Sequence, residues 1–277
     1  MSGAFLDEMA DASRARVQAA QRTRSEAALE EQARQSPAPP RLRLDRSGFD
    51  LIAEVKLRSP AAGQLGAPSE NLAGRVTAYA QAGAAAISVL TEPHRFDGSL
   101  EHLVSATRAL APLAVPAMRK DFLVDPYQVL EARAAGAGGV LVIVRMLSRG
   151  EIEALLDCAR SLGLFVLLEA FDARDIELMR ELIDAHTGSN QLLAGVNCRD
   201  LGTLQVVPRR LLELAPLLPA RVPRVAESGV ASEADARQIV AAGYQLALVG
   251  SALMQGNDPR ALTGTLLAAG RAARKAP

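Results

Sequence analysis

Eight short apolar runs recur along this chain, and each one ends in polar residues. The runs cover residues 50–56, 85–91, 114–119, 139–145, 164–169, 193–198, 222–227 and 245–250. Stretches of helical character lie between them, near 70–82, 99–110, 126–135, 149–162, 172–186, 208–217, 231–242 and 258–274. Continuous Val, Ile, Leu and Ala runs are typical of parallel strands buried on both faces. Eight alternating units predict an α/β fold, a closed (β/α)8 TIM barrel rather than an open sheet.

The length of the chain agrees with one such barrel. A (β/α)8 barrel takes about 250 residues, and the chain has 277 residues, of which 49% are hydrophobic. Two smaller domains would fit the length equally well, so the alternation of elements decides for the barrel. Because no segment of 20–50 residues repeats in the sequence, a solenoid is not indicated.

The first part of the chain differs from the rest. Residues 1–35 are rich in Ala, Arg, Glu and Gln, and Phe5, Leu6, Met9 and Val17 are spaced as one helical stripe. The run Ser36-Pro37-Ala38-Pro39-Pro40 then ends any helix, since proline lacks the amide donor. We therefore expect residues 1–48 to form a helical extension and linker, and 49–277 to form the catalytic barrel. The stripe should pack on the barrel, and a flexible tail is the alternative.

Composition excludes several classes of function. Lys+Arg and Asp+Glu both number 31, aromatic residues make up 3% and tryptophan is absent, so a nucleic-acid partner is not expected. The N-terminal residues lack a signal-peptide core, and no apolar run is long enough for a membrane span. Two cysteines, Cys158 and Cys198, are expected to be free thiols in a reducing compartment, the cytoplasm. The histidines and cysteines lack the spacing of a zinc site, so no metal is predicted.

Two lysines and three glutamates stand at the ends of the apolar runs. They are Lys56, Lys120, Glu54, Glu169 and Glu227. The carboxyl ends of barrel strands share one rim, where active sites of this fold lie. Desolvation at the rim can lower the pKa of a lysine, which then serves as a general acid, base or imine former. A ring of structural ion pairs is the alternative, because a buried carboxylate needs a partner in any case.

Two further groups follow later strands. Asn197 and Arg199 are two residues apart, so both side chains face the same way and can orient a carboxylate or hydroxyl. Ser228-Gly229 and Gly250-Ser251 follow the last two strands. Glycine there lets backbone N–H groups approach an anion, and loops seven and eight of such barrels commonly hold phosphate.

Taken in order, these segments resemble indole-3-glycerol phosphate synthase. The stretches that carry the resemblance are Ile52–Lys56 with Arg58-Ser59-Pro60, Ala86–Glu92, Phe96 with Gly98-Ser99, Arg119–Phe122, Asp125–Gln128, Gly195–Leu201, Glu227-Ser228-Gly229 and Leu248–Gly250. The likeness spans about residues 50–265, and the family also carries a helical extension before its barrel. The combination Arg-Lys-Asp-Phe, Asn-x-Arg-Asp-Leu and Glu-Ser-Gly is specific.

The resemblance implies a reaction and a role for each residue. The family closes the indole ring of 1-(2-carboxyphenylamino)-1-deoxyribulose 5-phosphate with loss of carbon dioxide and water, and it needs no metal or organic cofactor. Lys120 would be the general acid, Glu169 the base, and Glu54 with Lys56 the acid-side pair of the dehydration. The remaining implied contacts are Asn197, Arg199, Glu227, Ser228 and Phe122 for the substrate body, and Ser59, Gly229, Gly250 and Ser251 for its phosphate. We expect a monomer or homodimer with a small-molecule partner.

Departures from the family pattern leave alternatives open. Ala62 stands where the family usually has a loop lysine, and Arg145 ends the fourth run, where it would face or border the pocket. These changes leave room for a non-catalytic or altered-substrate paralogue. Another phosphate-binding barrel, such as an aminosugar isomerase, is a further alternative, but it would not need this set of lysines and glutamates together.

Overall fold

Eight parallel strands close into a barrel, as predicted. The computed structural model describes residues 2–45, 48–66, 71–186, 191–256 and 258–275. The barrel strands are β1 (Asp50–Val55), β4 (Ala86–Leu90), β5 (Ala117–Lys120), β6 (Gly139–Ile143), β7 (Phe165–Ala170), β8 (Leu192–Asn197), β9 (Arg224–Glu227) and β10 (Leu246–Val249). Each strand pairs in parallel with its neighbours in chain order, and β10 closes the ring on β1. The open-sheet alternative is therefore wrong.

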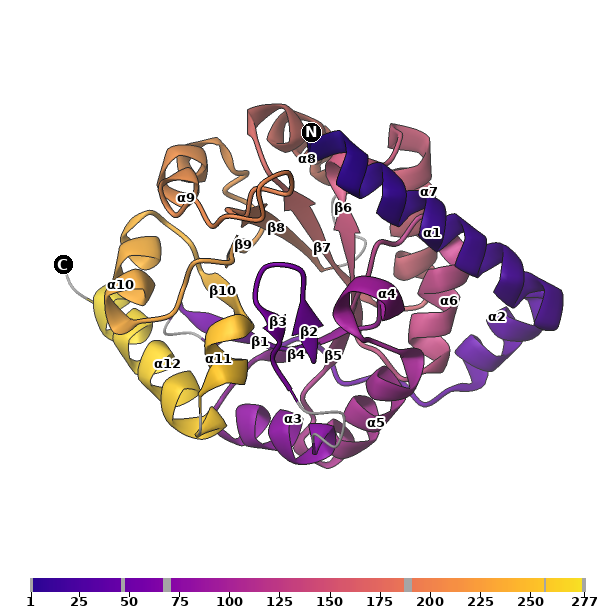
Figure 1. The fold of residues 1–277 in the computed structure, drawn as a ribbon, viewed down its shortest axis with the longest axis horizontal. Coiled ribbons are helices and arrows are strands. Elements are labelled where there is room, and N and C mark those ends of the chain that lie inside the picture. The colour runs from indigo at the N-terminus through magenta and orange to yellow at the C-terminus, as the bar shows by residue number, and fades with distance from the viewer. Residues whose placement is uncertain (1, 46–47, 67–70, 187–190, 257, 276–277) are drawn as a thin grey trace.

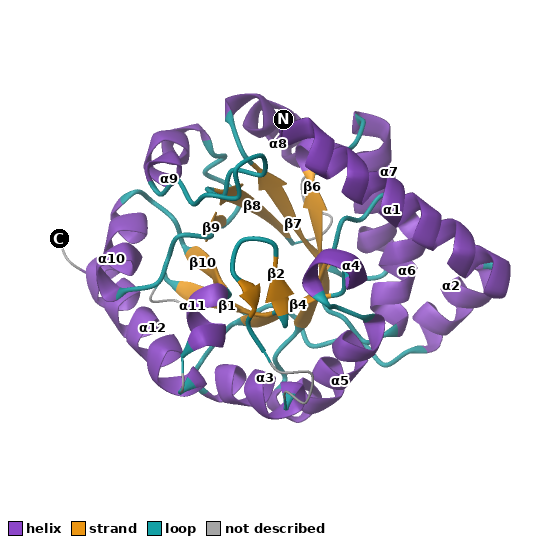
Figure 2. Cartoon of the chain, viewed as in Figure 1, coloured by secondary structure: helices purple, strands orange, loops and turns teal. Residues whose placement is uncertain are grey.

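Helices surround this ring on the outside (Figures 1 and 2). They are α3 (Leu72–Gln81), α5 (Leu100–Leu110), α6 (Pro126–Ala134), α7 (Arg149–Ser161), α8 (Ala173–Ala185), α9 (Arg209–Leu214), α10 (Glu233–Ala241) and α12 (Pro259–Lys275). Single 3-10 turns follow three elements, at Ala111–Leu113, Val144–Met146 and Ala215–Leu217. Local chemistry sets several starts: Asp125, Asp172 and Ser232 each accept a hydrogen bond from the first turn of the helix that follows.

Two layers of apolar side chains form the core. One lies between the strands and the helices, and it includes Val76, Leu103 and Val166. The other fills the barrel, where Ile52 and Leu167 stand among the inward-facing residues. Alternation along each strand separates the two layers. The inner layer forms a floor, above which the polar strand ends open.

Two leading helices lie against the barrel. They are α1 (Ser2–Thr23) and α2 (Glu26–Gln35), and α1 runs past α6 and α7 on one side of the ring in Figure 1, with contacts to both helices. The predicted stripe is buried at Leu6, Met9 and Val17, so the flexible-tail alternative is wrong. Hydrogen bonding anchors the helix as well, since the hydroxyl of Ser13 donates to the carbonyl oxygen of Phe122 at 2.5 Å.

Four short elements escaped the sequence analysis, and all four lie at the mouth of the barrel. They are the hairpin strands β2 (Arg58–Ser59) and β3 (Gly63–Gln64), and the helices α4 (Pro93–Phe96) and α11 (Ser251–Gln255). Elements of two to five residues are too short to show a hydrophobic period. In Figure 2 the hairpin lies across the centre of the ring, above the strand ends.

Candidate active site

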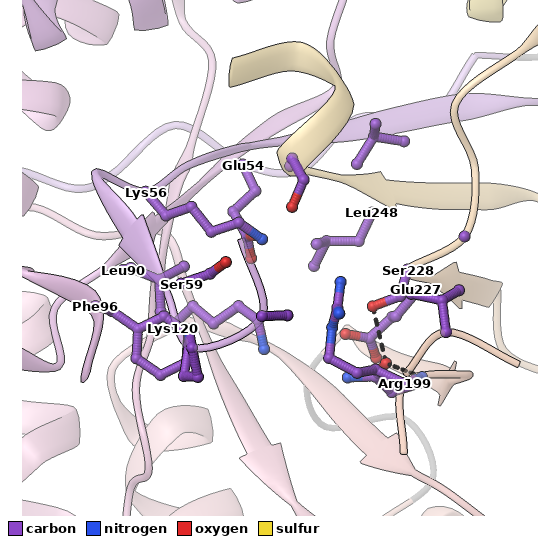
Figure 3. A pocket seen from close by; sticks show the side chains of 18 of the residues that line it. Glu54, Lys56, Ser59, Leu90, Phe96, Lys120, Arg199, Glu227, Ser228 and Leu248 are labelled. Carbon is purple, nitrogen blue, oxygen red and sulfur yellow. Dashed lines mark hydrogen bonds and ion pairs between the residues drawn. The ribbon is translucent and has the colours of Figure 1, made fainter. Parts of the chain in front are cut away.

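The polar strand ends meet in one cavity of about 320 Å³ at the carboxyl end of the barrel. Every residue that the sequence nominated for catalysis or binding lines this cavity. These are Glu54, Lys56, Ser59, Lys120, Phe122, Glu169, Asn197, Arg199, Glu227, Ser228, Gly229, Gly250 and Ser251. Figure 3 shows how several of them lie around the opening, with Lys56 and Lys120 on one side and Arg199 and Glu227 on the other.

Lys120 forms an ion pair with Glu169 across the cavity. Its Nζ donates to Glu169 Oε2 at 3.1 Å, and its side chain keeps 17% exposure to the pocket. Burial by itself lowers the pKa of this lysine, but the nearby carboxylates of Glu169, Glu227 and Glu54 outweigh it and raise the pKa above the ordinary 10.5. The prediction of a lowered lysine pKa is therefore wrong here. Lys120 is an ammonium at neutral pH, able to give a proton but not to act as a free amine.

A second ion pair joins neighbours on the first strand. Lys56 Nζ donates to Glu54 Oε1 at 2.6 Å, and Glu54 is 2% exposed. Gly250 of the last loop makes room for this pair. A Cβ atom there would overlap Glu54 Oε1 and lie 2.9 Å from Lys56 Nζ. The first and last strands of the barrel thus depend on each other at this point.

A chain of hydrogen bonds orients the carboxylate of Glu169. Asn197 Nδ2 donates to Glu169 Oε1 at 3.3 Å. The amide oxygen of Asn197 accepts from the hydroxyl of Ser228 at 2.9 Å and from the backbone N–H of Arg199 at 2.9 Å. Glu227 lies beside Glu169, and burial first, then the charge of Glu169, raises the pKa of Glu227 well above its ordinary value.

Arg199 is held at the edge of the cavity by its own loop. Its Nη1 donates to the carbonyl oxygen of Leu204 at 2.9 Å, and its guanidinium stands beside Ser228 and Glu227 in Figure 3. Cys198 between the two polar residues is fully buried, and burial raises the pKa of its thiol to about 11. Like Cys158 it is a free thiol, as predicted, and it is neutral at physiological pH.

The two loops nominated for phosphate lie side by side at the mouth. Ser228 and Gly229 both have left-handed backbones, with φ of 66° and 73°. Gly250 precedes α11, whose first residue is Ser251. Ser59 differs from the others, because its hydroxyl accepts a hydrogen bond from the N–H of Ala62 at 3.1 Å within the β2–β3 turn.

An apolar wall completes the cavity, and the sequence analysis missed most of it. Phe122 meets Phe5 of α1 edge-on with ring centroids 6.0 Å apart, and Phe96 of α4 at 6.1 Å. Ile143 and Leu248 line the cavity from β6 and β10. The alternation of side chains along each strand could have identified Ile143 and Leu248 as inward-facing. The position of Phe5, in contrast, depends on how α1 packs.

One prediction about the rim is wrong. Arg145 lies outside this cavity: its Nε donates to Asp175 Oδ2 at 2.8 Å, it also pairs with Asp172, and it lies over the ring of Phe171 at 4.8 Å. Strand β6 ends at Ile143, and the 3-10 helix that follows it (Val144–Met146) places Arg145 next to α8. It neither crowds the cavity nor offers an anion contact there.

Comparison with known proteins identifies the family. A family model described as indole-3-glycerol phosphate synthase matches residues 6–266. An indole-3-glycerol phosphate synthase of Parafrankia sp. (strain EAN1pec) is 42% identical over 269 residues, covering 96% of both chains. That of Mycolicibacterium vanbaalenii is 41% identical, covering 97% of this chain and 96% of its own.

Solved structures agree on the fold alone. Thiamine phosphate pyrophosphorylase from Pyrococcus furiosus has a TM-score of 0.60 at 16% identity, covering 82% of this chain and 98% of its own. A 3-hexulose-6-phosphate synthase has a TM-score of 0.58 at 20% identity, covering 80% and 99%. The family match and the relatives, over nearly the full length, show that the chain belongs to the indole-3-glycerol phosphate synthase family.

Proposed function

We propose that this protein closes the indole ring of 1-(2-carboxyphenylamino)-1-deoxyribulose 5-phosphate, releasing carbon dioxide and water. The observation that carries the proposal is the Lys120–Glu169 pair, at 3.1 Å, inside a cavity that also holds the Glu54–Lys56 pair. A charged acid and an ionised base stand at the same mouth. Ring closure followed by dehydration needs both in one site.

Lys120 gives the first proton. As an ammonium it protonates the ribulose carbonyl oxygen while the anthranilate ring carbon attacks the carbonyl carbon, so that the new carbon–carbon bond forms and the carbonyl becomes a hydroxyl. The ring then loses its carboxylate as carbon dioxide and regains its aromatic electrons. A positioned general acid contributes about 10²–10⁴-fold to such a step.

The dehydration needs a second proton and a base. Glu169, ionised beside Lys120 and Asn197, is placed to take a proton from the intermediate. The Glu54–Lys56 pair lies at the end of β1, across the ring from β7, which carries Glu169. This pair supplies the proton with which the hydroxyl leaves as water. The substrate receives two protons from the enzyme and loses one to it. The reaction therefore takes up one proton overall, as the loss of a carboxylate as carbon dioxide requires.

The other lining residues hold the substrate. Phe122 and the apolar wall suit the anthranilate ring, and Asn197 and Arg199 suit its polar groups. Backbone N–H groups around Ser228-Gly229 and Gly250-Ser251 suit the phosphate, with Ser59 at the hairpin edge. This assignment uses only side chains and backbone of the protein, and it includes no metal or organic cofactor.

We further propose that the extension of residues 1–48 and the barrel of 49–277 act as one unit, since α1 contributes Phe5 to the cavity. In the described part of the chain no helix combines the length and apolarity of a membrane span. A cytoplasmic location agrees with a small phosphorylated substrate.

Appearance of indole fluorescence from the anthranilate-ribulose phosphate tests the proposal. We expect turnover by the wild type and a loss of about 10²–10⁴-fold in Lys120→Met, with substrate binding retained because the phosphate contacts remain. Micromolar binding without turnover by the wild type would favour the non-catalytic paralogue instead. Turnover retained in Lys120→Met would contradict the assigned acid.

A further inference from the structure

Glu227 is a buried carboxyl group without a donor. It is 1% exposed, and among the described residues neither of its oxygens accepts a hydrogen bond. The charged group that acts on it most strongly is another carboxyl, that of Glu169, which lies within hydrogen-bond reach. Two ionised carboxylates cannot donate to each other, so this contact is a hydrogen bond only if one of them carries a proton.

The barrel is built to bring these two groups together. Glu169 on β7 pairs in register with Gly195 on β8, and Glu227 on β9 pairs with the next inward residue of β8, Asn197. A side chain at position 195 would displace the carboxyl of Glu227, because a Cβ atom there would overlap Glu227 Oε1 and lie 2.9 Å from Leu167 Cδ1. Glycine on the middle strand lets two carboxyls from flanking strands touch.

The surroundings of the two carboxyls are unequal. Glu169 accepts from Lys120 Nζ at 3.1 Å on one oxygen and from Asn197 Nδ2 at 3.3 Å on the other. Glu227, in contrast, has no such donor among the described residues. We infer that the pair holds one proton in the resting enzyme, that this proton sits on Glu227, and that Glu227 donates it to Glu169 in a hydrogen bond.

Like charges in one dry site leave one carboxyl neutral, and burial of Glu227 raises its pKa in the same direction. Lys120 opposes this shift, but it is bonded to Glu169 rather than to Glu227. The role of Glu227 follows from this proton. As a neutral acid it does not accept hydrogen bonds from the substrate as an anion would, but positions the base. This role rests on the proposed function, whereas the location of the proton does not.

Infrared difference spectroscopy tests the location of the proton without substrate. The comparison is between wild type and Glu227→Gln, both with carbon-13-labelled glutamate, at neutral pH. We expect a protonated-carboxyl band in the wild type that is missing from the variant. Absence of that band from the wild type, or its persistence in Glu227→Gln, would overturn the inference even if the enzyme turned out to have another substrate.

Two further variants separate positioning from structure. An amide can replace a neutral O–H donor, so Glu227→Gln should keep kcat within about tenfold. Glu227→Ala leaves Glu169 unsupported and should lose about 100-fold. Equal losses in both would contradict a role for the neutral donor. In Gly195→Ala, whose folding is checked by circular dichroism, the band should shift in frequency as the hydrogen bond between the two carboxyls breaks, and an unchanged band would also count against the inference.

Discussion

Gly250→Ala should damage catalysis through Glu54 rather than through the backbone. The φ of Gly250 is −123°, outside the left-handed region that favours glycine, so the contacts of the added methyl group set the effect of alanine. Its Cβ atom would overlap Glu54 Oε1 and lie 2.9 Å from Lys56 Nζ, where ordinary contacts begin at 3.4 Å. The ion pair must move, because the three atoms nearest to the added methyl group all belong to the side chains of Glu54 and Lys56.

The size of this movement sets the expected loss. Restoring an ordinary contact requires the Glu54 carboxyl to shift by on the order of 1 Å, and a misplacement of that size costs about 10²-fold in rate. Crowding a buried site also costs about 1–3 kcal/mol in the free energy of unfolding. The rate loss should appear in kcat, since the Glu54–Lys56 pair acts on the leaving hydroxyl.

Steady-state turnover by indole fluorescence measures the effect, and Gly264→Ala is the matched control. A Cβ atom at Gly264, on α12, meets nothing within 4 Å. The control should keep wild-type kcat and gain slight stability from the better helix former. If Gly250→Ala keeps kcat within about threefold, or if only KM rises, then the glycine serves the phosphate and not the ion pair.

Two predictions concern the anchoring of α1 and the strand end that carries Lys120. Arg16→Ala should lower the free energy of unfolding by about 1–3 kcal/mol, because Arg16 Nη2 lies 2.8 Å from Asp121 Oδ1 and is largely buried. Urea unfolding checks this, and Arg14→Ala, which removes only exposed pairs, should change it by less than about 1 kcal/mol; equal effects would show that α1 is not held by this bond. Asp121→Asn should cost about 1–3 kcal/mol at neutral pH, since the buried guanidinium of Arg119 loses one carboxylate partner at 3.1 Å and keeps the other, Glu131, at 2.9 Å. Burial raises the pKa of Asp121, but the charges of Arg119 and Arg16 outweigh it and lower the pKa below 3.8, so the stability from this charge is present above 3.8 and is lost as the pH falls through the lower, folded-state pKa. The gap in urea midpoint between wild type and Asp121→Asn should therefore narrow as the solution is acidified through that range, and a constant gap would refute the assignment.

The sequence alone determined the barrel fold and which residues lie at its rim. Strands buried on both faces need unbroken apolar runs, and a chain that alternates eight of these with helices has few ways to bury them. All strands of the ring fall within a few residues of their predicted positions. Residues at strand ends must share one edge of the barrel, so the sequence is enough to group Lys120, Glu169 and Glu227.

Only the tertiary structure decided how these residues act on one another. The pKa of Lys120 is raised, not lowered, because charges from three different strands outweigh burial, and no single stretch of sequence contains that sum. Arg145 points away from the rim because it lies in a 3-10 turn and forms ion pairs with Asp172 and Asp175 of the next β/α unit. Gly195 and Gly250 are needed because the carboxyls of Glu227 and Glu54 occupy the space that a side chain at these positions would fill. Patterns along the chain report which face a residue takes, whereas distances across the barrel arise only when the ring closes.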